Sequence, residues 1–183
     1  MRIDTLRQAY TLAIKWTAFP LHPDLPEAGL ALEDLFKGSH IDIGKVGARL
    51  KDAAAEVGLP LGERTMAYNT RLAHELAKWA EDQGRGDVFH RAVFGAYFVD
   101  NRNIGKVDEL VTIAEGLGFS GEEARKVLMA RSYKHEVDTD WARAKENGIT
   151  AVPAFAMNRA VITGAQPYET LEKFVRTHLP PNG

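Results

Sequence analysis

Apolar residues recur at helical spacing, one every three or four positions, along most of this chain. Such a period places them on one side of a helix, and that side then packs against the rest of the protein. Glycine, which commonly follows a helix, closes several of these segments. The pattern predicts helices at Arg2–Ala9, Leu30–Phe36, Ile43–Val57, Leu72–Ala80, Val88–Tyr97, Val107–Leu117, Ala124–Arg131, Val137–Ala144 and Leu171–Val175.

Two segments have the patterns of strands instead. Leu12, Ile14 and Trp16 alternate with smaller or polar residues, which predicts a strand over Leu12–Phe19. Near the C-terminus, a short apolar run ends at a two-residue break, Asn158-Arg159, and an apolar segment then resumes. This arrangement predicts an antiparallel hairpin over Ala154–Thr163. Strand, helical block, hairpin and closing helix together indicate a mixed α/β fold.

Pro153 stands near the start of the first hairpin strand, where a proline has no N–H for a sheet ladder. In one interpretation the strand begins at Ala154. In the other, the Val152–Pro153 bond is cis and presents its backbone to a ligand. Since only about 5–6% of X-Pro bonds are cis, periodicity by itself favours the first interpretation.

Composition narrows the classes of function. The 183 residues suit one domain, and 45% hydrophobic with 26% charged residues is usual for a globular protein. A net charge of −2 and a pI near 6.3 argue against a nucleic-acid binder. Without a run of ~18 apolar residues or a clear signal peptide, we expect no membrane partner and a cytoplasmic location.

The chain has no cysteine. Disulfides, thiolate nucleophiles and cysteine-based zinc sites are therefore excluded. The six histidines are dispersed, and we expect no metal site.

Three motifs, in order along the chain, resemble one family. They are Phe19-Pro-Leu-His-Pro-Asp-Leu-Pro26, Asn69-Thr-Arg-Leu-Ala-His74 and Gly148-Ile-Thr-Ala-Val-Pro-Ala-Phe155, the last followed by the hairpin and Gly164-Ala-Gln-Pro-Tyr-Glu169. They are similar to DsbA-like thioredoxin-fold proteins of the FrnE-like branch, relatives of 2-hydroxychromene-2-carboxylate isomerases and kappa-class glutathione transferases. The resemblance implies a single thioredoxin-like domain over 1–183 with a helical insertion at about 27–133. It also implies that the Val152–Pro153 bond is cis.

The chain departs from this family at its start. The family opens with a strand and then Cys-x-x-Cys at the start of a helix, whereas this sequence begins within that helix. We therefore expect an N-terminally truncated fold without the first strand. Dithiol chemistry requires a thiolate, so the chain as written does not exchange disulfides.

The resemblance places six residues at a cleft for substrate, and each also has a simpler interpretation. Asn69 can be only a helix N-cap, His74 only a packed or surface histidine, and Gln166 only a polar residue before a helix. Thr70 neighbours Asn69 in the family motif. Val152 and Pro153 complete the set, with the Val152 backbone as the expected contact.

Several functions stay open. The chain is a thiol-disulfide oxidoreductase by descent. Without cysteines it can instead be a module that binds glutathione, another small thiol or a peptide, or an isomerase-like enzyme, although isomerases of this superfamily commonly use a serine in the missing segment. It can also be a non-catalytic remnant, or a fragment of a longer protein that contains Cys-x-x-Cys.

The missing strand bears on assembly. In thioredoxin-like folds it lies between the second strand, here Leu12–Phe19, and the hairpin. Unpaired buried N–H and C=O groups cost about 1–3 kcal/mol each, and exposed sheet edges invite pairing. We therefore expect a homodimer that shares strands or N-terminal segments. The alternative is that Leu12–Phe19 pairs directly with the hairpin.

Overall fold

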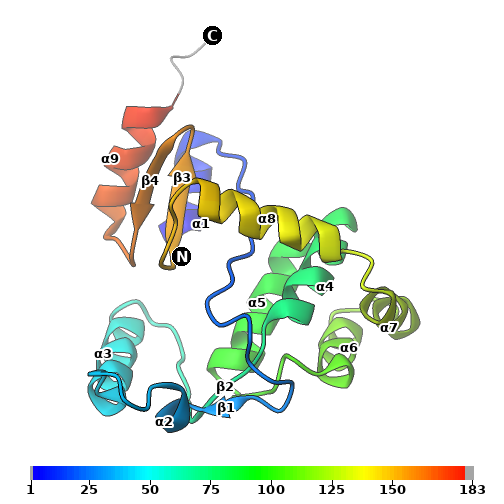
Figure 1. The fold of residues 1–183 in the computed structure, drawn as a ribbon. Coiled ribbons are helices and arrows are strands. Elements are labelled where there is room, and N and C mark those ends of the chain that lie inside the picture. Colours follow the sequence, from blue (N-terminus) through cyan, green and yellow to red (C-terminus); the bar gives the residue numbers. More distant parts are fainter. Residues whose placement is uncertain (1, 180–183) are drawn as a thin grey trace. The chain divides into compact units, whose positions relative to one another are not determined.

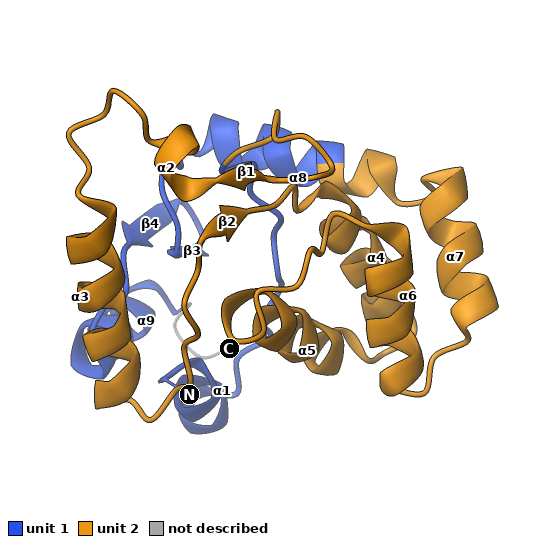
Figure 2. Cartoon of the chain, turned by 90° about the horizontal axis from the view of Figure 1, so that it is seen from below, with its two compact units in different colours: residues 1–21, 138–183 blue, residues 22–137 orange. Residues whose placement is uncertain are grey.

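The chain divides into two compact units (Figure 2). The computed structural model describes residues 2–179. Unit 1 takes residues 1–21 and 138–183 from the two ends of the chain, and unit 2 takes the continuous segment 22–137. The helical insertion expected over about 27–133 lies within unit 2.

Unit 1 contains a hairpin with helices from both ends of the chain (Figure 1). Its elements are α1 (Arg2–Tyr10), β3 (Ala154–Met157), β4 (Ala160–Thr163) and α9 (Tyr168–His178), and α8 (Lys134–Glu146) enters it from unit 2. Its small core joins Leu6 of α1 to Leu171 and Val175 of α9, with side chains of the hairpin packed against them. The helix predicted at Arg2–Ala9 and the closing helix are thus confirmed.

The predicted hairpin is also confirmed. β3 and β4 pair antiparallel, with Ala154 opposite Thr163 and Met157 opposite Ala160. Asn158 in the connecting turn has φ +56°, a left-handed conformation that asparagine tolerates better than most residues. Its side-chain amide also donates to the His178 carbonyl at 2.7 Å, so the turn is tied to the end of α9.

The strand predicted over Leu12–Phe19 is wrong: the segment has no secondary structure. The period-two pattern is real, because Leu12, Ile14 and Trp16 are half-buried and the residues between them are exposed. A strand also needs a ladder partner, and β3 is paired only with β4 among the described residues. The alternative that this segment pairs directly with the hairpin is therefore wrong as well. Its end is held differently, because the Ala18 N–H donates to the buried Asp140 carboxylate of α8 at 2.9 Å.

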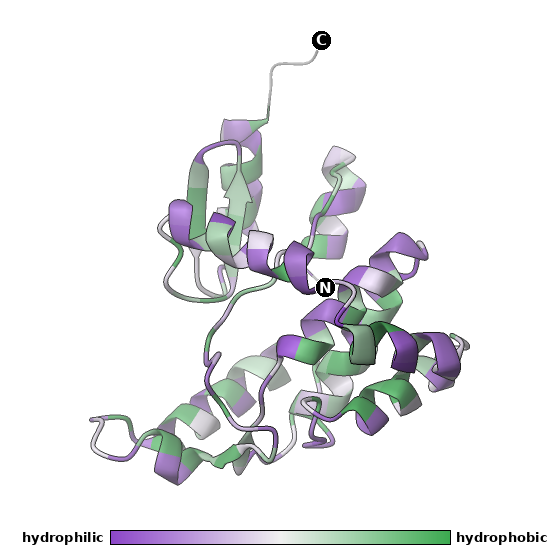
Figure 3. Ribbon diagram, turned by 45° about the vertical axis from the view of Figure 1, so that its right-hand side comes forward, coloured by the Kyte–Doolittle hydropathy of each residue, from purple (hydrophilic) through white to green (hydrophobic). Residues whose placement is uncertain are grey.

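Unit 2 is mainly helical. Its elements are β1 (Leu30–Ala31), α2 (Leu32–Leu35), α3 (Ile43–Glu56), β2 (Met66–Ala67), α4 (Arg71–Asp82), α5 (Gly86–Phe98), α6 (Val107–Gly116) and α7 (Gly121–Ala130). Both hydrophobic and hydrophilic segments occur along the helices (Figure 3). Helices α4 to α7 share one core, with Leu76, Phe89 and Leu110 fully buried. Ser120 caps the start of α7, since its side chain accepts from the Glu123 N–H.

One predicted helix of unit 2 is much shorter than expected. Instead of a helix over Leu30–Phe36, residues Leu30 and Ala31 pair with β2, and only Leu32–Leu35 is helical. The apolar residues spaced as in a helix instead belong to a two-residue strand, β1, and to the single helical turn α2 that follows it. The Leu32 N–H donates to the Thr65 carbonyl at 2.9 Å, so contact with a segment far along the chain decides the local structure.

Within residues 2–179, no helix combines the length and the apolar character that crossing a bilayer requires.

Candidate functional site

The start of β3 lies at the surface. Val152 keeps 45% of its surface accessible, and the Val152–Pro153 peptide bond is cis. The strand itself begins at Ala154, so both features considered from the sequence coexist. The Pro153 carbonyl accepts from the Gly164 N–H at 2.8 Å. This bond shows which residues of the first strand form hydrogen bonds with β4.

The bond between Pro153 and Gly164 determines which backbone groups of β3 are left without a partner in β4. In an antiparallel pair, alternate residues direct both their N–H and C=O toward the partner strand. Pro153 bonds toward β4, so Phe155 and Met157 do the same, in register with Ile162 and Ala160. Ala154 and Ala156 therefore direct their N–H and C=O to the opposite edge, and Val152 lies two residues before the start of the strand. No strand pairs with that edge within residues 2–179, and we call it the open edge of β3.

The side chains along this edge are small. Ala154 is half-buried and Ala156 is exposed, so neither methyl group blocks the approach of another main chain. Phe155 and Met157 belong to the core of unit 1 and anchor the strand from the other face. A fixed strand with an uncovered, sterically open edge is a template for an added extended chain.

Gln166 has a local role in the structure. Its side-chain amide donates to the Thr163 carbonyl at 2.6 Å, and its own carbonyl accepts from the Arg2 guanidinium at 3.1 Å. It thus secures the end of β4 and connects it to α1. This places it with Val152 and Pro153 in unit 1, but on the β4 side of the hairpin.

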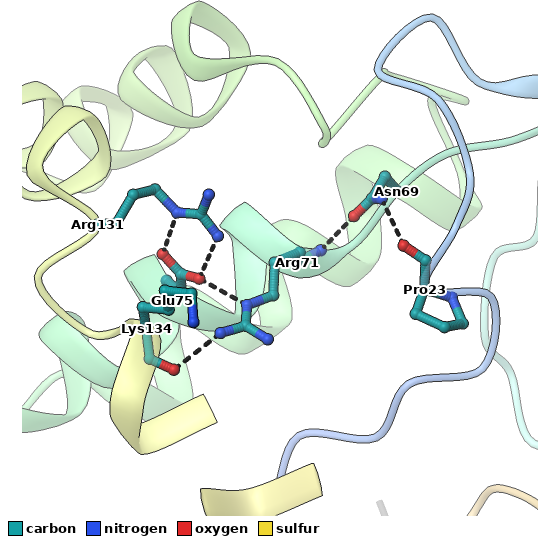
Figure 4. A network of polar contacts seen from close by, with 6 residues as sticks. All are labelled: Pro23, Asn69, Arg71, Glu75, Arg131 and Lys134. Carbon is teal, nitrogen blue, oxygen red and sulfur yellow. Dashed lines mark hydrogen bonds and ion pairs between the residues drawn. The ribbon is translucent and has the colours of Figure 1, made fainter. Parts of the chain in front are cut away.

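Asn69 holds a loop in unit 2 (Figure 4). Its side-chain oxygen accepts from the Arg71 N–H at 2.9 Å, while its amide donates to the carbonyls of Pro23 and Leu25 at 3.1 and 2.8 Å. The N-cap of α4 is Thr70, without a side-chain bond, so the predicted N-cap is displaced by one residue. Asn69 therefore joins the proline-rich loop to the start of α4.

Thr70 and His74 follow on the same helix. The Thr70 carbonyl accepts from the His74 N–H at 3.0 Å, and His74 is half-buried. The structure brings Asn69, Thr70 and His74 together at the first turn of α4 in unit 2. Val152, Pro153 and Gln166 lie in unit 1.

The residue that follows His74 on α4 is a buried carboxylate that is missing from the sequence-based site. Glu75 is 1% exposed and is flanked by two arginines (Figure 4). Arg71 Nε donates to it at 2.6 Å, and Arg131 donates through two nitrogens at 2.8 and 2.7 Å. Arg71 also donates to the Lys134 carbonyl at 2.8 Å. The signal in the sequence is Arg71 four residues before Glu75, within an apolar stripe.

The electrostatics of Glu75 are those of a stabilised anion. Burial raises the pKa of its carboxyl, but the hydrogen bonds and charges of Arg131 and Arg71 outweigh burial and hold that pKa below its usual value. A carboxylate kept ionised by two guanidinium groups is a poor proton carrier near neutrality. We assign it to structure, where it joins α4 to the segment between α7 and α8.

The described residues offer a limited set of reactive groups at these sites. The chain has no thiol. No group of three histidine or acidic side chains in residues 2–179 is placed to hold a metal ion. The open edge of β3 supplies main-chain donors and acceptors, which bind an extended backbone without reacting with it.

Comparison with known proteins gives a consistent picture. Residues 1–176 match the family described as the DSBA-like thioredoxin domain. The uncharacterized protein YwbO of Bacillus subtilis strain 168 is 34% identical over 107 residues, which are 58% of this chain and 54% of that protein. The matched part thus spans about half the length of this relative.

Solved structures are also similar. A probable DsbA oxidoreductase from Streptomyces coelicolor is 29% identical with a TM-score of 0.78, covering 86% of this chain and 71% of that one. A 2-hydroxychromene-2-carboxylate isomerase has a TM-score of 0.69 at 17% identity, covering 96% of this chain and 84% of its own. A putative protein disulfide isomerase from Nitrosomonas europaea has the same score and identity, with 96% and 87% covered. At 17% identity, these two structures show a shared fold alone.

Proposed function

Because the chain belongs to the DSBA-like thioredoxin domain family, we propose that it binds a short extended peptide or peptide-like thiol, such as glutathione, along the open edge of β3. The chain has the thioredoxin-like fold of that family but none of its cysteines. Disulfide exchange proceeds by attack of a thiolate on a disulfide sulfur. This chain cannot supply that group, so the proposed function is binding alone.

One observation carries the proposal: the uncovered main-chain edge that begins at Val152. Ala154 and Ala156 lie two residues apart in β3, so their backbone groups are spaced like those of a ladder, and Val152 adjoins the start of this edge. An extended ligand can pair with them as a further strand, in the manner of β-augmentation. The main chain gives affinity in such complexes, and the pockets for side chains give specificity.

The expected affinity is modest. A net hydrogen bond contributes about 0.5–1.5 kcal/mol, and a tripeptide spans only a few of them. A dissociation constant of about 1 mM corresponds to about −4 kcal/mol, which takes at least about three such bonds at the upper end of this range. Longer peptides bind more tightly if they extend along the edge to Ala156.

Calorimetry with a matched pair of proline variants tests the proposal. Ala154 and Thr163 are cross-strand partners, and each directs its N–H away from the ladder, to the open edge of β3 and to the outer edge of β4 respectively. Ala154→Pro therefore removes a donor from the proposed site, whereas Thr163→Pro removes one from the other side of the hairpin. We expect the unmodified chain and Thr163→Pro to bind glutathione, and Ala154→Pro to lose at least about tenfold in affinity.

Two results count against this function. One is no binding by the unmodified chain at about 10 mM glutathione or with an extended peptide. The other is binding by Ala154→Pro at unchanged affinity. Circular dichroism of both variants checks that the hairpin folds, and an insulin-reduction assay of the same preparation is expected to stay at the buffer rate.

We further propose a cytoplasmic location. A chain without cysteine forms no disulfide and gains no stability from an oxidising compartment. Fractionation of cells that express the protein, with a tag at the C-terminus, tests this assignment.

A further inference from the structure

The apolar side of α3 is uncovered. None of its 14 residues, all of which are described, is buried. In Figures 1 and 2, α3 stands apart from α4 to α7 of the same unit. Most helices in globular proteins bury an apolar stripe, and α3 has such a stripe without a partner for it in unit 2.

The stripe is concentrated and continuous. The stripe consists of Ile43, Val46, Leu50 and Val57, which are separated by three, four and seven residues in turn. This spacing keeps them on one side of the helix. Of the ten large hydrophobic residues that are exposed in residues 2–179, five lie between positions 41 and 59: Ile41, Val46, Leu50, Val57 and Leu59. Leu50, at the centre, is 54% exposed. Exposed apolar side chains gathered in this way mark an interaction surface.

The charges of α3 select the partner. Lys45, Arg49, Asp52 and Glu56 recur at i, i+4, i+7 and i+11, so they share another side of the helix. In this row the two basic residues lie in the N-terminal half of the helix and the two acidic residues in its C-terminal half, while a third basic residue, Lys51, lies outside the row. A second α3 in antiparallel orientation faces basic residues with acidic ones at both ends, whereas a parallel one places like charges together.

We infer that α3 binds the α3 of a second copy of this chain, antiparallel and with the two-fold axis near Leu50. The apolar stripe forms the centre of the contact, and the charged residues reach across its border. The self-complementary charge order fits an isologous interface, in which the same patch serves both subunits. This dimer requires no exchange of strands and no ligand at the open edge of β3.

The absence of cysteine makes disulfide trapping free of background. Val46 and Ala54 each stand four residues from Leu50, so an antiparallel pair places position 46 of one copy opposite position 54 of the other. Under mild oxidation we expect Leu50→Cys to cross-link with itself. A mixture of Val46→Cys and Ala54→Cys should form the mixed dimer, while Val46→Cys alone should not. Only positions with Cα atoms within about 7 Å can be bridged.

Sedimentation velocity over a range of concentrations measures the dimer itself. We expect Leu50→Glu to weaken the dimer about a hundredfold. A substitution on the two-fold axis changes both subunits, and the loss of each central contact weakens binding about tenfold. Val88→Glu is the matched control, because Val88 lies on α5 and is 44% exposed. This variant should dimerise as the unmodified chain does.

Three results would overturn the inference. The first is a monomer at every concentration up to about 0.5 mM. This is also the result expected if another part of the same chain packs against α3. The second is a dimer that Leu50→Glu leaves unchanged. The third is efficient self-cross-linking of Val46→Cys, which indicates a parallel pair.

Discussion

At the scale of single residues, Glu75 shows how a charge can be buried in an apolar helix face. The two arginines that bond to it compensate for its lost hydration. The i, i+4 spacing of Arg71 and Glu75 makes half of this arrangement readable from the sequence. Arg131 is 56 positions away along the chain, and no local pattern indicates which carboxylate a distant arginine will reach.

Replacing Glu75 by glutamine should lower the free energy of unfolding by about 2 kcal/mol at pH 7, because it takes the carboxylate from the largely buried Arg71 guanidinium and from the more exposed Arg131. The folded-state pKa of Glu75 lies below its unfolded value. Its stabilisation is therefore complete above the unfolded pKa of about 4.3 and is lost as the pH falls through the lower folded pKa. Urea titrations of both proteins at pH 7 and at lower pH measure the difference.

The gap between the two proteins should narrow below about pH 4. Glu146→Gln serves as the control, since Glu146 is exposed at the end of α8 and should change stability by less than about 0.5 kcal/mol. A gap that stays constant between neutral and acid pH would contradict the electrostatic role of Glu75.

At the scale of elements, the junction between α7 and α4 combines an unfavourable backbone with a favourable side chain. Arg131 follows α7 with φ +52°, a left-handed conformation that costs a non-glycine residue about 1–2 kcal/mol and that glycine normally occupies at this position. Its guanidinium makes the paired bonds to Glu75. Arginine therefore occupies a position where glycine is usual, and its side chain forms an ion pair that glycine could not make.

Arg131→Gly separates these two effects. In the unmodified chain we expect it to lower the free energy of unfolding by about 1–2 kcal/mol. The free energy lost with the ion pair exceeds the free energy gained when glycine takes the left-handed conformation. In a Glu75→Gln background it should cost almost nothing or stabilise by up to about 1 kcal/mol, since only the backbone relief remains. Equal effects in both backgrounds would show that Arg131 and Glu75 are not coupled.

The elements also show what sequence patterns can and cannot specify. The hairpin follows from a short apolar run, an Asn-Arg break and a second run, all within ten residues, and its structure agrees with that prediction. Leu12–Phe19 has an equally good alternating pattern and takes the predicted alternation of burial. It forms no strand, because a ladder depends on a partner that the pattern of the segment itself cannot supply.

At the scale of the whole molecule, family and function separate. Residues 1–176 match the family's model, yet the sequence contains no cysteine. The residues expected at the cleft fall into two groups, one on each unit. The sequence motifs identified both groups but not their local roles: Asn69 holds the proline-rich loop, and Gln166 secures the end of β4.

The central claim is that β3 keeps an open main-chain edge to which an extended ligand binds. Amide hydrogen exchange, followed by NMR, tests this claim for each residue of the edge. In the free chain, the N–H groups of Phe155 and Met157 should be protected, while those of Val152, Ala154 and Ala156 exchange rapidly. Saturating glutathione should protect Val152 and Ala154 and leave Phe155 and Met157 unchanged, and a longer extended peptide should also protect Ala156. The account is contradicted if Val152, Ala154 and Ala156 are already protected in the free chain, which would mean that another strand covers the edge, or if no ligand slows their exchange.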